Sequence, residues 1–434
     1  MSPFRKIALT IALGALFCAL PCEGQSAPPR KLSLRQAEDL ALASHPQVQA
    51  AQNEASAAGE RVREARSAYY PSVSADLTGS QSNHDARFGA GSLSASRLFD
   101  RFGQGISVSQ LITDLGRTSN LVASSKLQAQ AVQQDYQATR YDVLLRVNQA
   151  YFNALQAQAV VKVARETVAA RQQLFDQVTT LMQNKLKSQL DVSFTEVNLS
   201  DAKLLLIRAQ DGVQQAFAEL ARAIGSDQPA SFELTDEPLP ASPPDQPQPM
   251  IDEALKNRPE VASLRLSSDA AHRFAEAEKD LNRPTVSLAA VAGFLPLINA
   301  GQIPTEYEGA AVNLNIPIFN GHLFNARREA ARYRAAAEDQ RSKDIRLRVT
   351  RDVRVAWASA STAYQRLDVV AQFVKQASLA LALAQGRYNL GLSSIVELTQ
   401  AQLNLTRAEI ESLGAKYDYQ SQYSALQYAS GQLR

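Results

Sequence analysis

Residues 45–48 read His-Pro-Gln-Val, and residues 258–261 repeat them as Arg-Pro-Glu-Val. The same correspondence extends outward and joins 70–73 with 283–286, Val147 with Val353, Tyr151 with Trp357, Asn198 with Asn404 and Ile224 with Ser430. Residues 33–225 and 250–431 are therefore two copies of one pattern. Internal repetition of this kind fixes the architecture before any single motif does, because each copy has to fold into the same unit.

The first 27 residues have the pattern of a secretory signal peptide. Two basic residues precede an apolar run over residues 7–20, which is shorter than the roughly 20 residues that a transmembrane helix needs. Both cysteines, Cys18 and Cys22, lie in this segment, and a proline precedes Cys22. Lipidation of Cys22 stays open, and cleavage after residue 24 leaves a mature chain without cysteine in an oxidising compartment.

We divide the chain into a signal peptide (1–27), a first repeat (28–235), a Pro-rich linker (236–249) and a second repeat (250–434). The first copy is longer by a few residues between Gly79 and Gly116, which indicates a loop. The net charge is only +2, so there is no electrostatic argument for a nucleic-acid partner.

Each copy predicts the same order of elements. An opening helix of roughly 34 residues begins after the N-cap Ser33, which forms a capping box with Gln36, and ends at Tyr70-Pro71. Two strands of about nine residues follow, in which polar and apolar side chains alternate. The remaining elements are a long helix (117–181 and 322–386), a short turn (184–189 and 390–395) and a return helix that ends near 225 or 430.

The long helices keep a seven-residue apolar period. Its members are Val147, Ala154, Val161, Val168, Phe175 and Met182 in the first copy, and Val353, Ala360, Leu367, Val374, Leu381 and Tyr388 in the second. This repeat is typical of coiled coils. Each long helix spans roughly 100 Å, and the opening and return helices placed end to end have nearly the same length.

Four strands per chain, apolar on one face, are predicted in a secreted protein for which we expect no other membrane-spanning segment. In a bilayer every backbone N–H and C=O needs a partner, so a sheet has to close into a barrel. Closure takes about eight strands or more, so the barrel has to be shared, with eight strands in a dimer or twelve in a trimer. The alternative is a soluble periplasmic coiled-coil scaffold with two hairpins.

The chain resembles the TolC-like outer membrane efflux proteins over its mature length. The resemblance rests on the duplicated order of elements, on Asn-Ile-Pro-Ile-Phe-Asn-Gly at 315–321 and on Tyr-Asn-Leu-Gly-Leu-Ser-Ser-Ile-Val-Glu-Leu at 388–398. It implies a mainly α chain with a small β part, in which a long antiparallel coiled-coil helical barrel joins four strands of a trimeric, twelve-stranded outer-membrane β-barrel. The implied partners are two further copies, outer membrane lipid, a periplasmic adaptor protein and an inner-membrane pump.

The resemblance also implies where the functional residues lie. The adaptor would contact the helical turns at Lys185, Leu186, Ser188, Gly391, Leu392, Ser393 and Ser394, and the periplasmic gate would consist of Asp191, Tyr388 and Glu397. Two plainer interpretations stay open: Gly391 as an ordinary helix C-cap and Glu397 as a solvated carboxylate at a helix N-terminus. Lys185 departs from the glycine pattern and, with Lys187 beside it, makes the first groove more basic.

Enzymatic chemistry has little support in the sequence. The four histidines, His45, His84, His272 and His322, lack the spacing of a zinc site. There is no nucleophile elbow and no phosphate-binding loop, and Gly103-Gln104-Gly105 lacks the third glycine and is expected to be a loop feature. We expect no catalytic residue, cofactor or metal. The predicted function is a passive outer-membrane exit duct for efflux or secretion, with an ATP-driven polypeptide secretion conduit as the alternative.

Overall fold

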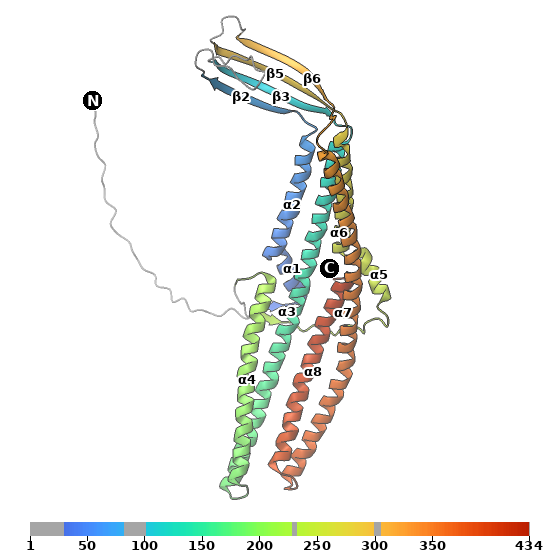
Figure 1. Ribbon diagram of the computed structural model, residues 1–434. Coiled ribbons are helices and arrows are strands. Elements are labelled where there is room, and N and C mark those ends of the chain that lie inside the picture. Colours follow the sequence, from blue (N-terminus) through green and yellow to red (C-terminus); the bar gives the residue numbers. More distant parts are fainter. Residues whose placement is uncertain (1–29, 82–100, 228–231, 299–304, 434) are drawn as a thin grey trace, which may run out of the picture.

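The computed structural model describes residues 30–81, 101–227, 232–298 and 305–433. The predicted signal peptide, Cys22 and the middle of both predicted strand-connecting loops lie outside the described residues. The chain is mainly helical and carries one four-stranded sheet at the end of a long, narrow body (Figure 1).

Both repeats contain the predicted order of elements. The first contains α1 (Leu34–Ser44), α2 (Pro46–Ser67), β2 (Ser72–Ser80), β3 (Arg101–Thr113), α3 (Arg117–Gln183) and α4 (Gln189–Ile224). The second contains α5 (Gln248–Asn257), α6 (Pro259–Lys279), a 3-10 turn (Asp280–Asn282), β5 (Thr285–Ile298), β6 (Glu306–Asn315), α7 (Leu323–Asn389) and α8 (Ile395–Ser430). Two short strands, β1 (Arg30–Leu32) and β4 (Phe232–Leu234), pair in parallel at mid-height.

The predicted single opening helix is wrong in both repeats, because each is broken into two helices. His45 and Arg258 have extended backbones (ψ 125°) directly before Pro46 and Pro259. A proline disfavours helical geometry in the residue before it and cannot donate the backbone hydrogen bond of a helix interior, but it fits the first helical position. The predicted capping box of Ser33 with Gln36 is confirmed.

The four-stranded sheet has the order β2-β3-β5-β6, and all its pairs are antiparallel. β3 and β5, with 13 and 14 residues, are longer than predicted and extend into segments expected to be loops. The predicted loop feature Gly103-Gln104-Gly105 is wrong for the same reason, since it lies inside β3 and pairs with both neighbouring strands. Both outer edges of the sheet, β2 and β6, are unpaired within the described chain.

The two faces of the sheet differ as the alternation predicts. Residues directly opposite each other in an antiparallel pair point to the same face. One face carries apolar side chains that are more than half exposed in the single chain, namely Val73, Leu77, Ile106, Ile112, Val312 and Leu314. The other face carries Ser74, Asp76 and Ser107, and Ser107 Oγ donates to Asp76 Oδ2 over 3.2 Å.

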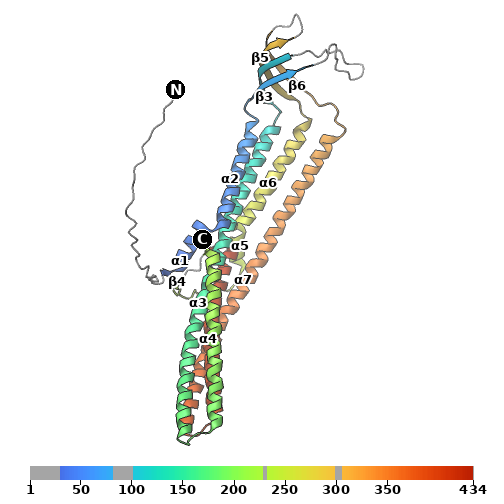
Figure 2. The same cartoon turned by 90° about the vertical axis from the view of Figure 1, so that its left-hand side faces the viewer.

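The helices form a wall one layer thick. Near the sheet the order across the wall is α2-α3-α6-α7 (Figure 2), and in the half away from the sheet it is α4-α3-α8-α7. The predicted end-to-end stacking is confirmed: α2 and α4 lie along α3, and α6 and α8 lie along α7. Alanine and valine fill the seams between helices, with Val147, Ala154, Val353 and Ala360 fully buried.

At mid-height, equivalent residues of the two repeats make similar hydrogen bonds. The hydroxyl of Tyr151 donates to the carbonyls of Leu32 and Thr235 over 2.9 and 2.7 Å. Trp357, its counterpart in the second repeat, donates through Nε1 to the carbonyl of Pro244 over 2.7 Å. Equivalent residues of the two long helices therefore hold the segment between the two repeats against the helical wall.

The unpartnered edge of the wall is strongly apolar. By length and composition, α7 contains one window that could cross a membrane, but only 17% of that window is buried, and a single such helix among the described residues is weak evidence for a span. Val369, Phe373, Leu379 and Leu383 are among the exposed apolar residues of this helix. A helix edge of this kind is typical of a surface that another helix covers.

Candidate functional site at the helical tip

The tip opposite the sheet consists of two turns with the same geometry. In the first, the N–H of Leu186 donates to the carbonyl of Leu181 over 2.9 Å, and in the second the N–H of Leu392 donates to the carbonyl of Arg387 over 2.8 Å. These are bonds of the Schellman motif, which requires a left-handed residue before the donor. Gly391 (φ 73°) and Lys185 (φ 60°) take that conformation. Gly391 therefore is a helix C-cap, and Lys185 takes the same conformation at a cost of about 1 kcal/mol.

Serines begin both return helices. Ser188 and Asp191 form a reciprocal capping box, in which the backbone N–H of Ser188 donates to Asp191 Oδ2 over 3.0 Å and the N–H of Asp191 donates to Ser188 Oγ over 3.2 Å. Ser394 Oγ accepts the N–H of Glu397 over 3.3 Å. Each acidic residue of the predicted gate therefore lies in the first turn of a helix, where the helix dipole stabilises a negative charge.

Glu397 is paired within its own hairpin. Its Oε1 lies 3.2 Å from Nε of Arg387, and both side chains are about half exposed. Arg387 also donates to the carbonyl of Leu392 over 3.3 Å. Arg387 was not among the residues predicted from the sequence. Its position near the end of α7 could have indicated the pair with Glu397, because in an antiparallel hairpin the last turn of one helix lies beside the first turn of the next.

Tyr388 is the centre of the tip. It is buried in an apolar cluster drawn from both hairpins, whose members are Leu174, Val178, Val192, Ala384, Ile395, Leu398 and Ala401. The ammonium group of Lys187, from the turn of the other hairpin, lies 4.3 Å from the ring centroid. Among the described residues the Tyr388 hydroxyl has no hydrogen-bond partner. Burial and, after it, the nearby charge of Asp191 raise the pKa of Tyr388.

Asp191 therefore lies near enough to Tyr388, across the two hairpins, for its charge to raise the pKa of that residue, whereas Glu397 pairs with Arg387. The residues predicted to contact an adaptor lie at the outer surface of the tip. Leu186 and Leu392 are 69% and 66% exposed, and Ser393 is half-buried with an unbonded hydroxyl among the described residues. Exposed leucines at both turns of the tip are typical of a protein-binding surface.

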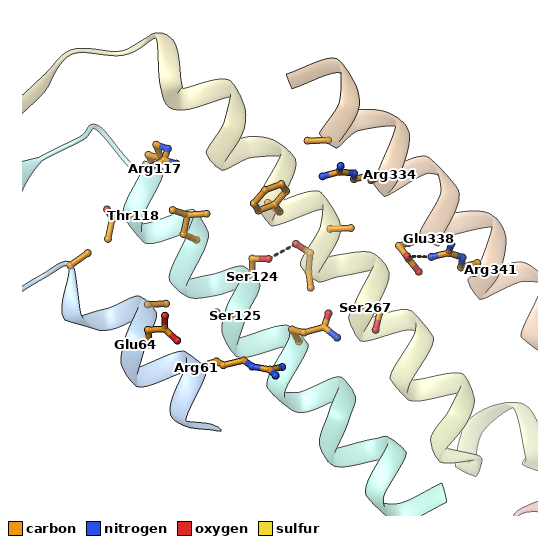
Figure 3. Close-up of a pocket in the computed structure, with 18 residues that line it drawn as sticks. Arg61, Glu64, Arg117, Thr118, Ser124, Ser125, Ser267, Arg334, Glu338 and Arg341 are labelled. Carbon is orange, nitrogen blue, oxygen red and sulfur yellow. Dashed lines mark hydrogen bonds and ion pairs between the residues drawn. The ribbon is translucent and has the colours of Figure 1, made fainter. Parts of the chain in front are cut away.

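A second candidate is a groove of 980 Å³ in the helical wall close to the sheet (Figure 3). Four arginines (Arg61, Arg117, Arg334, Arg341) and two glutamates (Glu64, Glu338) line it. Ser124 Oγ donates to the carbonyl of Ala270 over 2.8 Å at its floor, and Glu338 pairs with Arg341. Between these charged side chains, Leu121, Phe274 and several alanines also line the groove. Nowhere in the described ranges do three or more His, Cys, Asp or Glu residues gather to hold a metal ion.

The comparisons agree with this geometry. The model of the family described as outer membrane efflux protein matches residues 38–226 and 250–432, one match in each repeat. The chain is 25% identical to the outer membrane protein TolC of Escherichia coli over 412 residues, which cover 89% of this chain and 81% of that protein. It is also 25% identical to the alkaline protease secretion protein AprF of Pseudomonas aeruginosa over 416 residues, which cover 93% of this chain and 85% of that protein.

Solved structures show the same fold. A membrane protein from Pseudomonas aeruginosa superposes with a TM-score of 0.79 at 22% identity, over 92% of this chain and 93% of that chain. The CmeC outer membrane channel of Campylobacter jejuni superposes with a TM-score of 0.77 at 18% identity, over 99% of this chain and 94% of that chain.

Proposed function

The chain belongs to the outer membrane efflux protein family, and from that premise we propose that three copies form one duct whose periplasmic tip is the gate. It is an outer-membrane exit duct with a periplasmic extension. Membership of this family excludes the alternative of a soluble periplasmic scaffold. The proposal has three parts: the number of chains that share the barrel, the contacts that close the duct and the partner that binds its tip.

The unpaired sheet edges support a shared barrel. Four strands with free edges at β2 and β6 are too few to close in a bilayer, where unpaired backbone groups cost several kcal/mol each. Pairing β6 of one copy with β2 of the next satisfies both edges, and three copies give twelve strands. The exposed apolar face then contacts lipid and the serine-rich face lines the lumen.

The helical wall has edges that fit the same assembly. In its lower half α4 and α7 are the two edges. α4 carries an exposed apolar row (Leu190, Phe194, Val197, Leu204, Ile207), and α7 carries Val369, Phe373, Leu379 and Leu383. Because the two helices run in opposite directions, α4 of one copy can pack against α7 of the next as an antiparallel coiled coil.

The mass of the purified complex tests the number of copies. Native mass spectrometry of the full chain in detergent should give three times the mass of the mature chain. The matched variant Leu204→Glu places a charge on the proposed seam and should shift the complex toward single chains, whereas Lys203→Glu, exposed on the adjacent position of the same helix, should not. A mass of two chains would favour the eight-stranded dimer and overturn the proposal.

The tip contacts support the gate. Lys187 and Tyr388 join the two hairpins of one copy, Arg387 and Glu397 join the two helices of the second hairpin, and the buried Tyr388 hydroxyl has no partner within the described chain. A buried unbonded hydroxyl is costly, and this oxygen is already covered by atoms of its own chain. The Asp191 carboxylate, whose charge raises the pKa of Tyr388, is therefore the acceptor that we assign to it in the closed assembly. Opening separates the hairpins and exposes the cluster around Tyr388.

The exposed leucines of both turns support the adaptor contact. They lie beside Lys185 and Lys187 in the first turn and beside Gly391 in the second, so the two grooves differ in charge. An inner-membrane pump would supply the energy. AprF is named as an alkaline protease secretion protein and TtgC of Pseudomonas putida as a probable efflux pump outer membrane protein, so a polypeptide secretion conduit is the second candidate. Identifying the inner-membrane component that co-purifies with the tip-bound adaptor separates the two.

A further inference from the structure

Four residues lie directly opposite one another in a row across the sheet. Asp76 on β2 pairs with Gly105 on β3, Gly105 pairs with Gly293 on β5, and Gly293 pairs with Tyr307 on β6. All four belong to the same face of the sheet, the one that carries Ser74 and the hydrogen bond between Ser107 and Asp76.

The side chain of Tyr307 lies flat across the two glycines. A Cβ atom at Gly105 would lie 2.2 Å from the phenolic oxygen of Tyr307. A Cβ atom at Gly293 would lie 2.3 Å from the same oxygen and 2.4 Å from Cζ, and also 2.5 Å from the backbone carbonyl oxygen of Gln104. Neither approach is possible for real atoms, so the ring occupies the space that two side chains would otherwise fill. A glycine within a strand often marks such a close approach.

A second pair has the same arrangement. A Cβ atom at Gly103 would lie 2.6 Å from a methyl carbon of Leu295. Gly103 and Gly105 are one pleat apart on the same strand, so the recess extends along β3. Other glycines of the sheet differ: at Gly309, two residues after Tyr307 on β6, the nearest atom to an added Cβ is Val291 Cγ2 at 4.0 Å, an ordinary contact.

We propose that Tyr307 sets the width of the duct at the level of the sheet, because Gly105 and Gly293 form a recess that holds its ring against the wall. This inference rests on the proposed function, since it takes the polar face as the lumen face. Three tyrosines at one level of a twelve-stranded barrel leave the bore wide when they lie flat and narrow it when they stand upright. The two glycines therefore set how far the three rings reach into the bore at this level.

The test is the single-channel conductance of the full chain in planar bilayers. Gly105→Ala places a methyl group 2.2 Å from the phenolic oxygen, so the ring has to leave the recess, and we expect a lower conductance than that of the wild type. Gly309→Ala adds the same methyl group to the same face without touching Tyr307 and should leave conductance unchanged. Gly293→Ala, on the opposite side of the recess, should reproduce the loss, although its methyl group also meets the carbonyl oxygen of Gln104.

Reversal makes the test specific. In the double variant Gly105→Ala/Tyr307→Ala, conductance should return at least to the wild-type value, because no ring remains to enter the lumen. Because the tip lies in series with the sheet, each variant is also measured with Asp191→Ala/Tyr388→Phe, in which the proposed gate is weakened. An unchanged conductance of Gly105→Ala, or a loss that Tyr307→Ala does not reverse, overturns the inference. If the wild-type chain forms no channels, the proposed function fails instead.

Discussion

The ammonium group of Lys187 lies 4.3 Å from the centroid of the Tyr388 ring. This contact joins the turn of the first hairpin to the last turn of α7, so it connects the two repeats at the tip. A cation over an aromatic ring contributes about 0.5–2 kcal/mol, depending on how far the pair is desolvated. Tyr388 is 4% exposed, which gives the contact one buried partner.

Lys187→Ala removes this contact, and we expect a higher open probability of the channel in planar bilayers. Lys187→Arg should behave like the wild type, because a guanidinium group also binds an aromatic face. Lys203→Ala is the matched control, since it removes an exposed lysine from the same hairpin away from the tip. Equal recordings from Lys187→Ala and Lys203→Ala would show that the contact does not hold the tip closed.

Substitution by alanine should have opposite effects at Gly391, in the second turn, and at Gly386, inside α7. Gly391 has φ 73°, and an added Cβ would meet no atom within 4 Å, so only backbone strain opposes alanine there. Gly391→Ala should destabilise the tip by about 1 kcal/mol. Gly386→Ala, inside α7 and equally free of contacts, should stabilise it by up to about 1 kcal/mol through helix propensity.

Hydrogen exchange of the tip amides measures both changes. Lys185→Gly should also slow exchange in the first turn, because glycine accepts the left-handed backbone that Lys185 adopts at φ 60°. If Gly391→Ala and Gly386→Ala shift exchange in the same direction, the C-cap role of Gly391 is wrong.

The pair of Arg387 and Glu397 predicts two opposite shifts of ion selectivity. If the carboxylate faces the pore, its partner at 3.2 Å offsets part of its charge. Arg387→Ala should therefore increase cation selectivity, and Glu397→Gln should decrease it. The reversal potential across a KCl gradient measures both, at low salt because screening shortens the range of each charge. If neither variant moves the reversal potential, the pair faces away from the pore.

His45 predicts a loss of stability in acid. Burial, and after it the positive charges of Arg146 and Arg222, lower the pKa of His45 from its ordinary value of 6.5. Its Nδ1 accepts the backbone N–H of Gln47 over 3.2 Å and so caps α2. Because the unfolded chain takes up this proton more readily than the folded chain, stability is complete above pH 6.5 and falls as the pH drops toward the lowered pKa.

His45→Asn keeps an acceptor at this cap but does not titrate. The difference between the urea midpoints at pH 7.5 and 5.5 should therefore be smaller for His45→Asn than for the wild type. Equal differences would mean that the acid sensitivity arises from other groups.

The long elements were predictable because their signals are periodic. The seven-residue spacing of residues such as Val147 and Ala154 reports the seam of α3 directly, and the alternation around Val73 reports a sheet face. The break at His45 was missed although Pro46 signals it, because a proline is disfavoured inside a helix and favoured at the first position of a new one. The length of β3 was missed because its glycines resemble a loop until Tyr307 and Leu295 are seen to fill their space.

The positions of the predicted gate residues follow from the sequence for a similar reason, whereas their role as a gate stays a prediction. Asp191 and Tyr388 lie near each other because both are one turn from a helix end at the tip. The pairing of Glu397 with Arg387, and the position of Lys187 over a ring, depend on how side chains cross between helices. Spacing along the chain does not specify these contacts.

The most direct test of the gated duct is the single-channel conductance of the full chain with and without Asp191→Ala/Tyr388→Phe. These substitutions remove the carboxylate beside Tyr388 and the buried hydroxyl that lacks a partner among the described residues, and they keep the apolar ring in its cluster. Asp201→Ala/Tyr364→Phe alters the same residue types away from the tip and is the matched control. The account predicts a higher conductance for the tip variant and a wild-type conductance for the control, and an unchanged conductance of the tip variant would contradict it.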